Sequence, residues 1–307
     1  MAQPDPRARG RRLLGDKGRS STGPSKVINA MTIDVEEWFH PEAVRIAAPI
    51  ERWPSFPSHI ERQVSRLLDL LDEAETRATF FVLGQVARGV PRLIRAMCER
   101  GHEVASHGDG HQMITDLEPE AFRRDLVDAK ATLEDITGRP VLGYRAPTFS
   151  VMRKTWWALD IIEATGHRYD SSIYPIHHDR YGIPDSPRFP YRLANGLAEL
   201  PGSTVRFFGV NVPFGGGGYL RLLPLVLNTV ALTYLNEVEK RPFVVYLHPW
   251  ETDPMQPRLE LPMTRRYRHY GNVATMLDRL RSLLASFRFD TAVALLEEEG
   301  LINAGDR

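Results

Sequence analysis

Two histidines, His107 and His111, follow an apolar run with three residues between them. On one turn of a helix, side chains at positions i and i+4 lie on the same face. Two neutral imidazoles at that separation can bind a divalent metal ion. The chain has ten histidines in 307 residues, so chance alone would produce such a pair roughly one time in three. The pair therefore indicates a metal site only if carboxylates and acid–base groups accompany it.

Two carboxylates follow the first apolar run of the chain, at residues 27–33. If the extended backbone continues through Glu36, the alternation of a strand places Asp34 and Glu36 on one side and Val35 on the other. The carboxyl ends of strands are where α/β proteins place their chemistry. We therefore expect both carboxylates to serve a site, with a solvated acidic turn as the alternative.

Short apolar runs alternate with amphipathic helical patterns along the chain, which predicts a parallel sheet or barrel of βα units. Strands are predicted at 27–33, 78–83, 102–106, 141–144 and 243–247. Helices are predicted at 60–71, 91–100, 122–136, 155–165, 219–239 with a break near Pro224, 273–284 and 291–298, and residues 169–172 follow the helix at 155–165. Arg145, Asp170 and His248 lie at or just after the ends of such runs. In a βα architecture these ends gather on one rim.

The segment 174–218 differs from the rest because it is rich in proline and ends in four consecutive glycines. It predicts loops and short strands in an accessory region. A glycine run can cradle a phosphate, but no Gly-Lys-Ser/Thr follows it here. A tight or mobile turn is the favoured interpretation.

Charge and composition limit the classes of partner. Lys+Arg and Asp+Glu both number 39, so no overall basic field favours nucleic acid. Residues 1–26 carry seven Lys or Arg against two Asp, and we predict a disordered basic tail there, favouring a solvated leader over a nucleic-acid or membrane-surface role. No apolar run is long enough for a transmembrane helix, and the N-terminus lacks the apolar region of a secretory signal. A cytoplasmic location is the resulting expectation.

The residue types at the predicted rim suit hydrolysis of an amide or ester. Two histidines and one carboxylate, with one position left for water, are typical of catalytic zinc. Such an ion makes its bound water far more acidic. A second carboxylate can then accept the proton of that water, a further histidine can protonate the leaving group, and an Arg or Asp can orient either of them.

Over residues 27–250 the sequence resembles the polysaccharide deacetylases, the NodB-homology group of carbohydrate esterases. The resemblance lies in five stretches that occur in the family's order, namely 32–36, 106–111, 145–149, 169–172 and 247–250. Residues 214–224 and the helices after Trp250 resemble most the branch associated with bacterial exopolysaccharide and exosortase gene clusters.

The resemblance implies a distorted (β/α)7 barrel at 27–250, with a loop-rich accessory segment at 174–240 and a C-terminal helical extension at 251–307. Asp34 would be the general base, oriented by Arg145. His248 would be the general acid, oriented by Asp170. The metal ligands would be Glu36, His107 and His111.

One departure concerns the first motif, where the family has two adjacent aspartates and this chain has Asp34-Val35-Glu36. Glu36 is the expected ligand, and Glu37 is the alternative. The expected ion is a divalent metal, with zinc favoured and cobalt or nickel as alternatives. Trp38, Phe149 and Trp250 would contact the substrate, or alternatively pack in the core.

The implied activity is removal of N-acetyl groups from an N-acetylated sugar or polysaccharide, such as an exopolysaccharide precursor. One alternative keeps the metal site but hydrolyses a small cyclic amide. Another is a catalytically silent carbohydrate-binding protein. The sequence does not indicate an oligomeric state.

Overall fold

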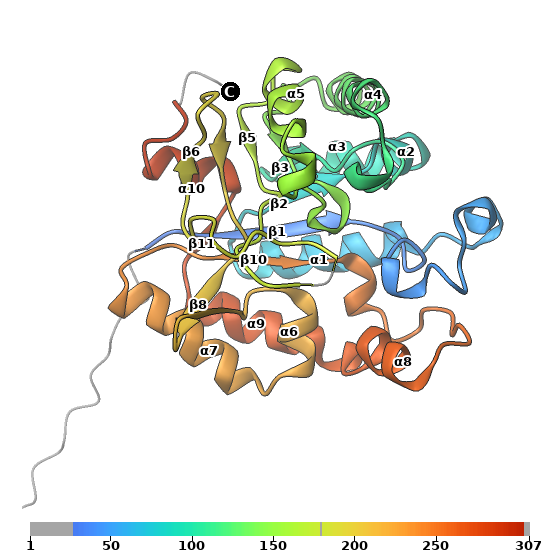
Figure 1. Cartoon of the computed structure of the whole chain (residues 1–307). Coiled ribbons are helices and arrows are strands. Elements are labelled where there is room, and N and C mark those ends of the chain that lie inside the picture. Colours follow the sequence, from blue (N-terminus) through green and yellow to red (C-terminus); the bar gives the residue numbers. More distant parts are fainter. Residues whose placement is uncertain (1–26, 179, 304–307) are drawn as a thin grey trace, which may run out of the picture.

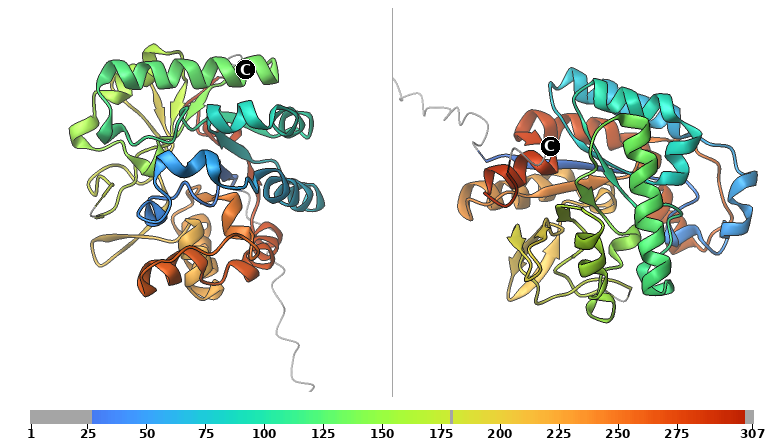
Figure 2. Two further views of the ribbon diagram at one scale, coloured as in Figure 1. Left: turned by 90° about the vertical axis from the view of Figure 1, so that its right-hand side faces the viewer. Right: turned by 90° about the horizontal axis from the view of Figure 1, so that it is seen from above.

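A computed structural model describes residues 27–178 and 180–303. The tail predicted at residues 1–26 lies outside this range. Figure 1 shows a central curled sheet with helices around it, and the left view of Figure 2 shows these helices on several sides of the sheet. The predicted α/β class is confirmed, and the curled sheet is consistent with a distorted (β/α)7 barrel.

The main sheet contains nine strands in the order β10-β1-β2-β3-β4-β5-β7-β6, with β11 also paired to β1. All pairs in it are parallel except β6 with β7. The strands are β1 Asn29–Val35, β2 Thr79–Val82, β3 Glu103–Ser106, β4 Gly143–Tyr144, β5 Tyr169–Asp170, β6 Tyr191–Arg192, β7 Ala198–Glu199, β10 Val244–Leu247 and β11 Phe289–Asp290. A separate antiparallel hairpin consists of β8 Thr204–Phe207 and β9 Val210–Pro213.

The helices connect the strands on the outside of the sheet (Figure 1). They are α1 Ile60–Glu73, α2 Gly84–Gly89, α3 Pro91–Glu99, α4 Pro119–Thr137, α5 Ala158–Ala164, α6 Gly217–Leu222, α7 Leu225–Thr233, α8 Met263–Tyr270, α9 Met276–Ser286 and α10 Ala292–Glu298. A π-helical turn, Tyr234–Val238, continues α7. The predicted break near Pro224 is confirmed, since α6 ends at Leu222 and α7 begins at Leu225.

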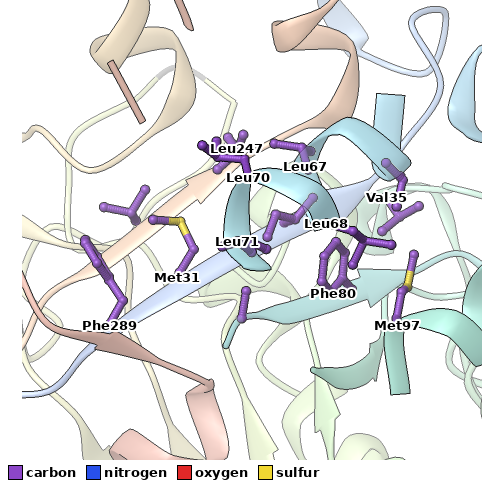
Figure 3. Close-up of a cluster of buried hydrophobic side chains, with 14 of the residues drawn as sticks. Met31, Val35, Leu67, Leu68, Leu70, Leu71, Phe80, Met97, Leu247 and Phe289 are labelled. Carbon is purple, nitrogen blue, oxygen red and sulfur yellow. The ribbon is translucent and has the colours of Figure 1, made fainter. Parts of the chain in front are cut away.

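The largest core cluster lies between β1 and the helices that cover it. Figure 3 shows α1 side chains Leu67, Leu68 and Leu71 packed beside Met31 of β1 and Phe80 of β2. Each of these is at most 3% exposed. Burial of apolar side chains is the main favourable term in folding. This core therefore holds β1 rigidly in place, and the functional carboxylates extend from its end.

The C-terminal segment differs from the expected helical extension. It contains α8, α9 and α10, but also β11, whose Phe289 and Asp290 pair with Asn29 and Ala30 of β1. Phe289 and Leu280 belong to the same core cluster as β1. Residues after 250 therefore complete the barrel core. Within residues 27–178 and 180–303, no helix has the length and apolar character needed to cross a membrane.

Candidate active site

The carboxyl end of β1 presents Asp34 and Glu36 into one buried polar cluster. Asp34 is 2% exposed and Glu36 3%. Arg145 directly follows β4. Its side chain extends toward β1 and donates from Nη1 to Asp34 Oδ1 at 2.7 Å. The same guanidinium donates to the Thr32 hydroxyl and to Ser171, and it lies 4.1 Å from the ring centre of Phe81. These contacts fix one oxygen of Asp34 and leave the second oriented toward His248.

Glu36 lies between the two predicted metal ligands. Its Oε1 is 3.0 Å from His107 Nε2 and 2.8 Å from His111 Nε2. One ligand atom from each of the three residues lies within 4.8 Å of the others, and all three side chains are buried. His107 Nδ1 donates to the carbonyl oxygen of Arg145 at 2.8 Å, which leaves Nε2 as the unprotonated nitrogen. Two imidazole nitrogens and a carboxylate oxygen form the donor set of a catalytic zinc site.

The histidine pair does not lie on a helical turn, so that expectation is wrong. Both residues belong to the loop after β3. Gly108 has φ +79° and His111 has φ +55°, and glycine tolerates such angles at no steric cost. Asp125 of α4 accepts from the backbone N–H groups of residues 109 and 110. The loop backbone therefore brings the two imidazoles together.

Glu37, the alternative ligand, is directed elsewhere. Its carboxylate accepts from the Ser58 hydroxyl and from the backbone N–H of His59. Burial raises the pKa of Glu37 above its usual value. The structure therefore places Glu36, and not Glu37, beside the two histidines.

His248 follows β10 and faces the two carboxylates of β1. Its Nε2 is 3.9 Å from Asp34 Oδ2 and 3.8 Å from Glu36 Oε1. Its Nδ1 is 3.1 Å from Glu251 Oε2. Burial alone would lower the pKa of His248, but the carboxylates of Glu36, Glu251 and Asp34 outweigh it and raise that pKa to about 9. An imidazolium at this position can donate a proton.

Glu251 is itself held by a buried arginine. Arg221 Nε donates to Glu251 Oε1 at 2.8 Å, and both side chains are 1% exposed. Arg221 also donates to the carbonyl oxygens of Gly271 and Arg268. Burial opposes ionisation of Glu251, yet Arg221 and His248 lower its pKa to about 2. A fixed, ionised Glu251 therefore sets the orientation of the His248 ring.

The expectation that Asp170 orients His248 is wrong. Both oxygens of Asp170 accept from Ser172, one from the hydroxyl at 2.5 Å and one from the backbone N–H at 3.2 Å. Asp170 also interacts with Glu199, and burial raises the pKa of Asp170 to about 6. The physical reason is the alternation of side chains after β5, because Ser171, and not Asp170, faces Arg145.

The glycines at 216 and 217 leave the space that the side chains of Tyr246 and Glu251 occupy. A Cβ at Gly217 would lie 1.9 Å from Glu251 Oε2, and one at Gly216 would lie 2.5 Å from the Tyr246 hydroxyl. Gly216 also forms a parallel bridge to Tyr246 of β10. The glycine run therefore allows close approach of α6 to the end of β10. The predicted tight or mobile turn is wrong, because Gly217 and Gly218 begin α6 and Gly216 bridges to Tyr246 of β10.

The three aromatic residues expected at the substrate occupy different environments. Trp38 is 1% exposed, donates to the carbonyl oxygen of Pro57 and packs with Phe39 and Trp53. The core alternative therefore fits Trp38, and Trp250 belongs to the same buried cluster. Trp250 stacks on His248 with ring centres 5.4 Å apart, and Phe149 lies 5.5 Å from the Arg145 guanidinium. For these two, substrate contact stays a prediction.

Two family models match successive parts of this chain. Residues 55–169 match the family model described as polysaccharide deacetylase. The chain contains a NodB-homology polysaccharide deacetylase domain. Residues 171–297 match a second model, described as a domain of unknown function (DUF3473). The deacetylase segment supplies His107, His111 and Arg145, and the second segment supplies His248 and the Arg221–Glu251 pair.

Curated relatives match only part of this chain. A peptidoglycan deacetylase-like protein of Gibberella zeae is 33% identical over 113 residues, which is 36% of this chain and 32% of that protein. A chitooligosaccharide deacetylase of Rhizobium leguminosarum bv. trifolii is 27% identical over 112 residues, 36% of this chain and 48% of that one. A Bacillus cereus peptidoglycan-N-acetylglucosamine deacetylase is 30% identical over 82 residues, 27% of this chain and 38% of that one. The matches thus span a third to a half of these relatives.

A solved structure matches almost the whole chain. A crystal structure from Mycobacterium smegmatis assigned to the polysaccharide deacetylases has a TM-score of 0.57 and 21% identity, covering 91% of this chain and 92% of that one. The fold shared with that structure therefore extends through residues 171–297.

The partner of His248 can be tested directly. Glu251→Gln removes the charge that orients the His248 ring and stabilises its protonated form, so we expect kcat on an N-acetylated sugar to fall by about 10²-fold or more. Asp170→Asn is the matched control and should change kcat by less than about ten-fold, because Asp170 contacts Ser172 instead. Steady-state kinetics on both variants show whether Glu251 or Asp170 orients His248. Equal losses would contradict the assignment to Glu251.

Gly217→Ala should act through the same carboxylate. The added methyl group displaces Glu251 from His248, so we expect kcat to fall while bound metal is unchanged. Gly218→Ala is the matched control, since a Cβ there meets no atom within 4 Å. Metal analysis and kinetics on the two purified variants check this, and loss of metal in Gly217→Ala would refute it.

Proposed function

We propose that this protein is a divalent-metal-dependent hydrolase that removes N-acetyl groups from a sugar or polysaccharide. The observation that carries the proposal is the convergence of Glu36, His107 and His111 beside an Asp34–Arg145 pair and His248. These groups come from distant parts of the chain. Few structural roles require so many buried ionisable groups in one place.

Asp34 is suited to accept a proton. Arg145 fixes Oδ1, and Oδ2 faces the space between Asp34 and His248 Nε2. Holding one oxygen fixes the direction of the other, which keeps the base aligned with the reacting atoms. His248 stands on the opposite side with a raised pKa. Its Nε2 proton is available for the departing amine, while Glu251 keeps Nδ1 in place.

The three candidate ligands fit a metal ion. Their ligand atoms lie within 4.8 Å of one another, and His107 is held in the required tautomer by the Arg145 carbonyl. When bound, a divalent ion would acidify water and polarise the acetyl carbonyl oxygen. Zinc is the favoured ion for two imidazoles and one carboxylate, with cobalt and nickel as alternatives. A cation on Glu36 would also lower the pKa of His248 toward neutrality.

The substrate class is supported by relatives named as peptidoglycan and chitooligosaccharide deacetylases. Both names denote N-acetylated sugars in polymers. An exopolysaccharide precursor in the cytoplasm is our specific proposal, based on the sequence resemblance. Phe149 and Trp250 border Arg145 and His248 and would pack against the sugar and its acetyl group.

Acetate release tests the proposal. The purified full chain is incubated with N-acetylglucosamine oligomers, as prepared, after treatment with a chelator, and after readdition of zinc, cobalt or nickel. We expect acetate to be released, to stop on chelation and to return with one of the metals. Sugar binding without acetate release at any metal would support a silent binding protein and contradict the proposal.

A further inference from the structure

An unpartnered apolar face runs along α7 and the π-helical turn that follows it. Its residues are Val226, Leu227, Val230, Tyr234 and Val238, and each is between 40% and 64% exposed. Four of them recur at intervals of four residues and so follow one side of the helix. The opposite side is buried through Ala231, Leu232 and Leu235. We call Val226, Leu227, Val230, Tyr234 and Val238 the α7 face.

Four of the five residues of the α7 face lie in an uncharged stretch, and the fifth, Val238, follows Glu237. Between Arg221 and Glu237, no residue carries a charge. Surface helices of globular proteins normally present charged or polar side chains on the side away from the core. Because the α7 face carries no charge and only the Tyr234 hydroxyl as a polar group, it marks an interaction surface. Figure 1 shows α7 on the outside of the molecule, at the lower left.

The point at which the described chain begins is fixed beside this helix. Asn29 and Asn236 exchange two side-chain hydrogen bonds, at 3.0 and 2.9 Å, and Asn29 Nδ2 also donates to the carbonyl oxygen of Val27. The 26 preceding residues carry seven Lys or Arg and two Asp. The chain that precedes Val27 is therefore strongly basic, and Asn29 joins the start of the described chain to the end of the α7 face.

The apolar α7 face and the basic sequence of residues 1–26 together limit what can bind this surface. The segment 1–26 has few large apolar residues, so it does not offer a cover for the apolar side chains. A second copy of the chain would need roughly 20–30 residues a side for a stable interface, and one helix offers five. An anionic bilayer presents both an apolar interior and negative headgroups. It complements the exposed helix and the basic segment at the same time.

We propose that the α7 face docks on an anionic membrane surface, with the basic residues of segment 1–26 contacting the lipid headgroups. This places the protein on a membrane as a peripheral protein without a spanning helix. It is independent of the proposed deacetylase activity. The apolar side chains enter the interfacial layer, and the basic segment supplies the preference for negative lipids.

Flotation with vesicles tests the inference. The full chain is mixed with vesicles of phosphatidylcholine containing phosphatidylglycerol, and with vesicles of phosphatidylcholine alone. We expect binding to the anionic vesicles that is at least about ten-fold stronger than to the neutral ones and that weakens at high salt. A full chain whose seven Lys and Arg in residues 1–26 are changed to Gln should lose this preference.

The variant V226Q/V230Q/V238Q tests the contribution of the α7 face to vesicle binding separately from that of the basic segment. Gln is a good helix former, and all three positions are more than 60% exposed, so the fold should be retained. The matched control is I46Q/V127Q/M263Q, which removes exposed apolar side chains elsewhere. We expect the first variant to lose vesicle binding and the control to keep it. Thermal unfolding and circular dichroism confirm that both remain folded.

Two results would overturn the inference. One is equal binding of the V226Q/V230Q/V238Q variant and the unmodified chain to anionic vesicles. The other is a dimer, measured by sedimentation, that the variant dissociates while vesicle binding is absent in both. That second result would assign the α7 face to a second copy of this chain.

Discussion

Glu36→Gln is expected to leave the purified protein with little bound metal and with acetate release near background. The change removes the only anionic donor of the three, and Glu36 Oε1 lies within 3.0 Å of both histidine nitrogens. Loss of residues that merely support metal ligands already costs 10 to 100-fold in affinity, so loss of a ligand should cost at least about 100-fold. Elemental analysis and titration of the metal-free protein with zinc measure it.

Glu37→Gln is the matched control because it makes the same change one residue further along. Glu37 contacts Ser58 and His59, so the variant should bind metal as the unmodified chain does. If Glu37→Gln lost the metal while Glu36→Gln kept it, the ligand assignment would be wrong. Thermal unfolding of each variant separates loss of metal from loss of fold.

Asp34→Asn should lower kcat by about 10² to 10⁴-fold, which is the range expected when a general base is removed. Metal content should be unchanged, because the amide has nearly the same shape and Glu36 remains. The amide oxygen can still accept from Arg145, but a buried guanidinium without its charged partner lowers the melting temperature. Acetate release at saturating substrate, together with metal analysis, checks both parts.

The control for Asp34→Asn is Asp290→Asn. Asp290 also pairs with an arginine, Arg77 at 2.6 Å, but the Arg77 side chain is 53% exposed and the pair lies away from the carboxyl end of β1. A surface ion pair contributes little to stability, so both kcat and melting temperature should change little. Full activity in Asp34→Asn would remove Asp34 from the proposed chemistry.

Much of this site was predictable because strands have a simple period. Alternation along the predicted strand places Asp34 and Glu36 on one side. The structure brings both carboxylates into one cluster, although β1 ends at Val35 and the Glu36 N–H donates to the Asp34 carbonyl oxygen. His107, Arg145 and His248 each follow an apolar run, and parallel strands end at one edge of a sheet. The buried cluster that the structure shows was therefore accessible from residue types and positions alone.

Other features depend on tertiary contacts that no local pattern encodes. The pairing of His248 with Glu251 joins residues three apart, but the ionised state of Glu251 depends on Arg221, 30 residues earlier. A glutamate directly after the stretch 247–250 was the available signal. The positive φ of His111 and the short strand β11 were also invisible, because neither leaves a periodic trace in the sequence.

The position of β1 in the sheet affects how the nascent chain folds. β1 pairs with β2 on one side, but its other neighbour, β10, begins at Val244. More than 200 residues must be synthesised before that edge is covered, and exposed strand edges favour aggregation. We expect slow folding dominated by this closure, and a ribosome-associated chain that depends on chaperones until β10 emerges.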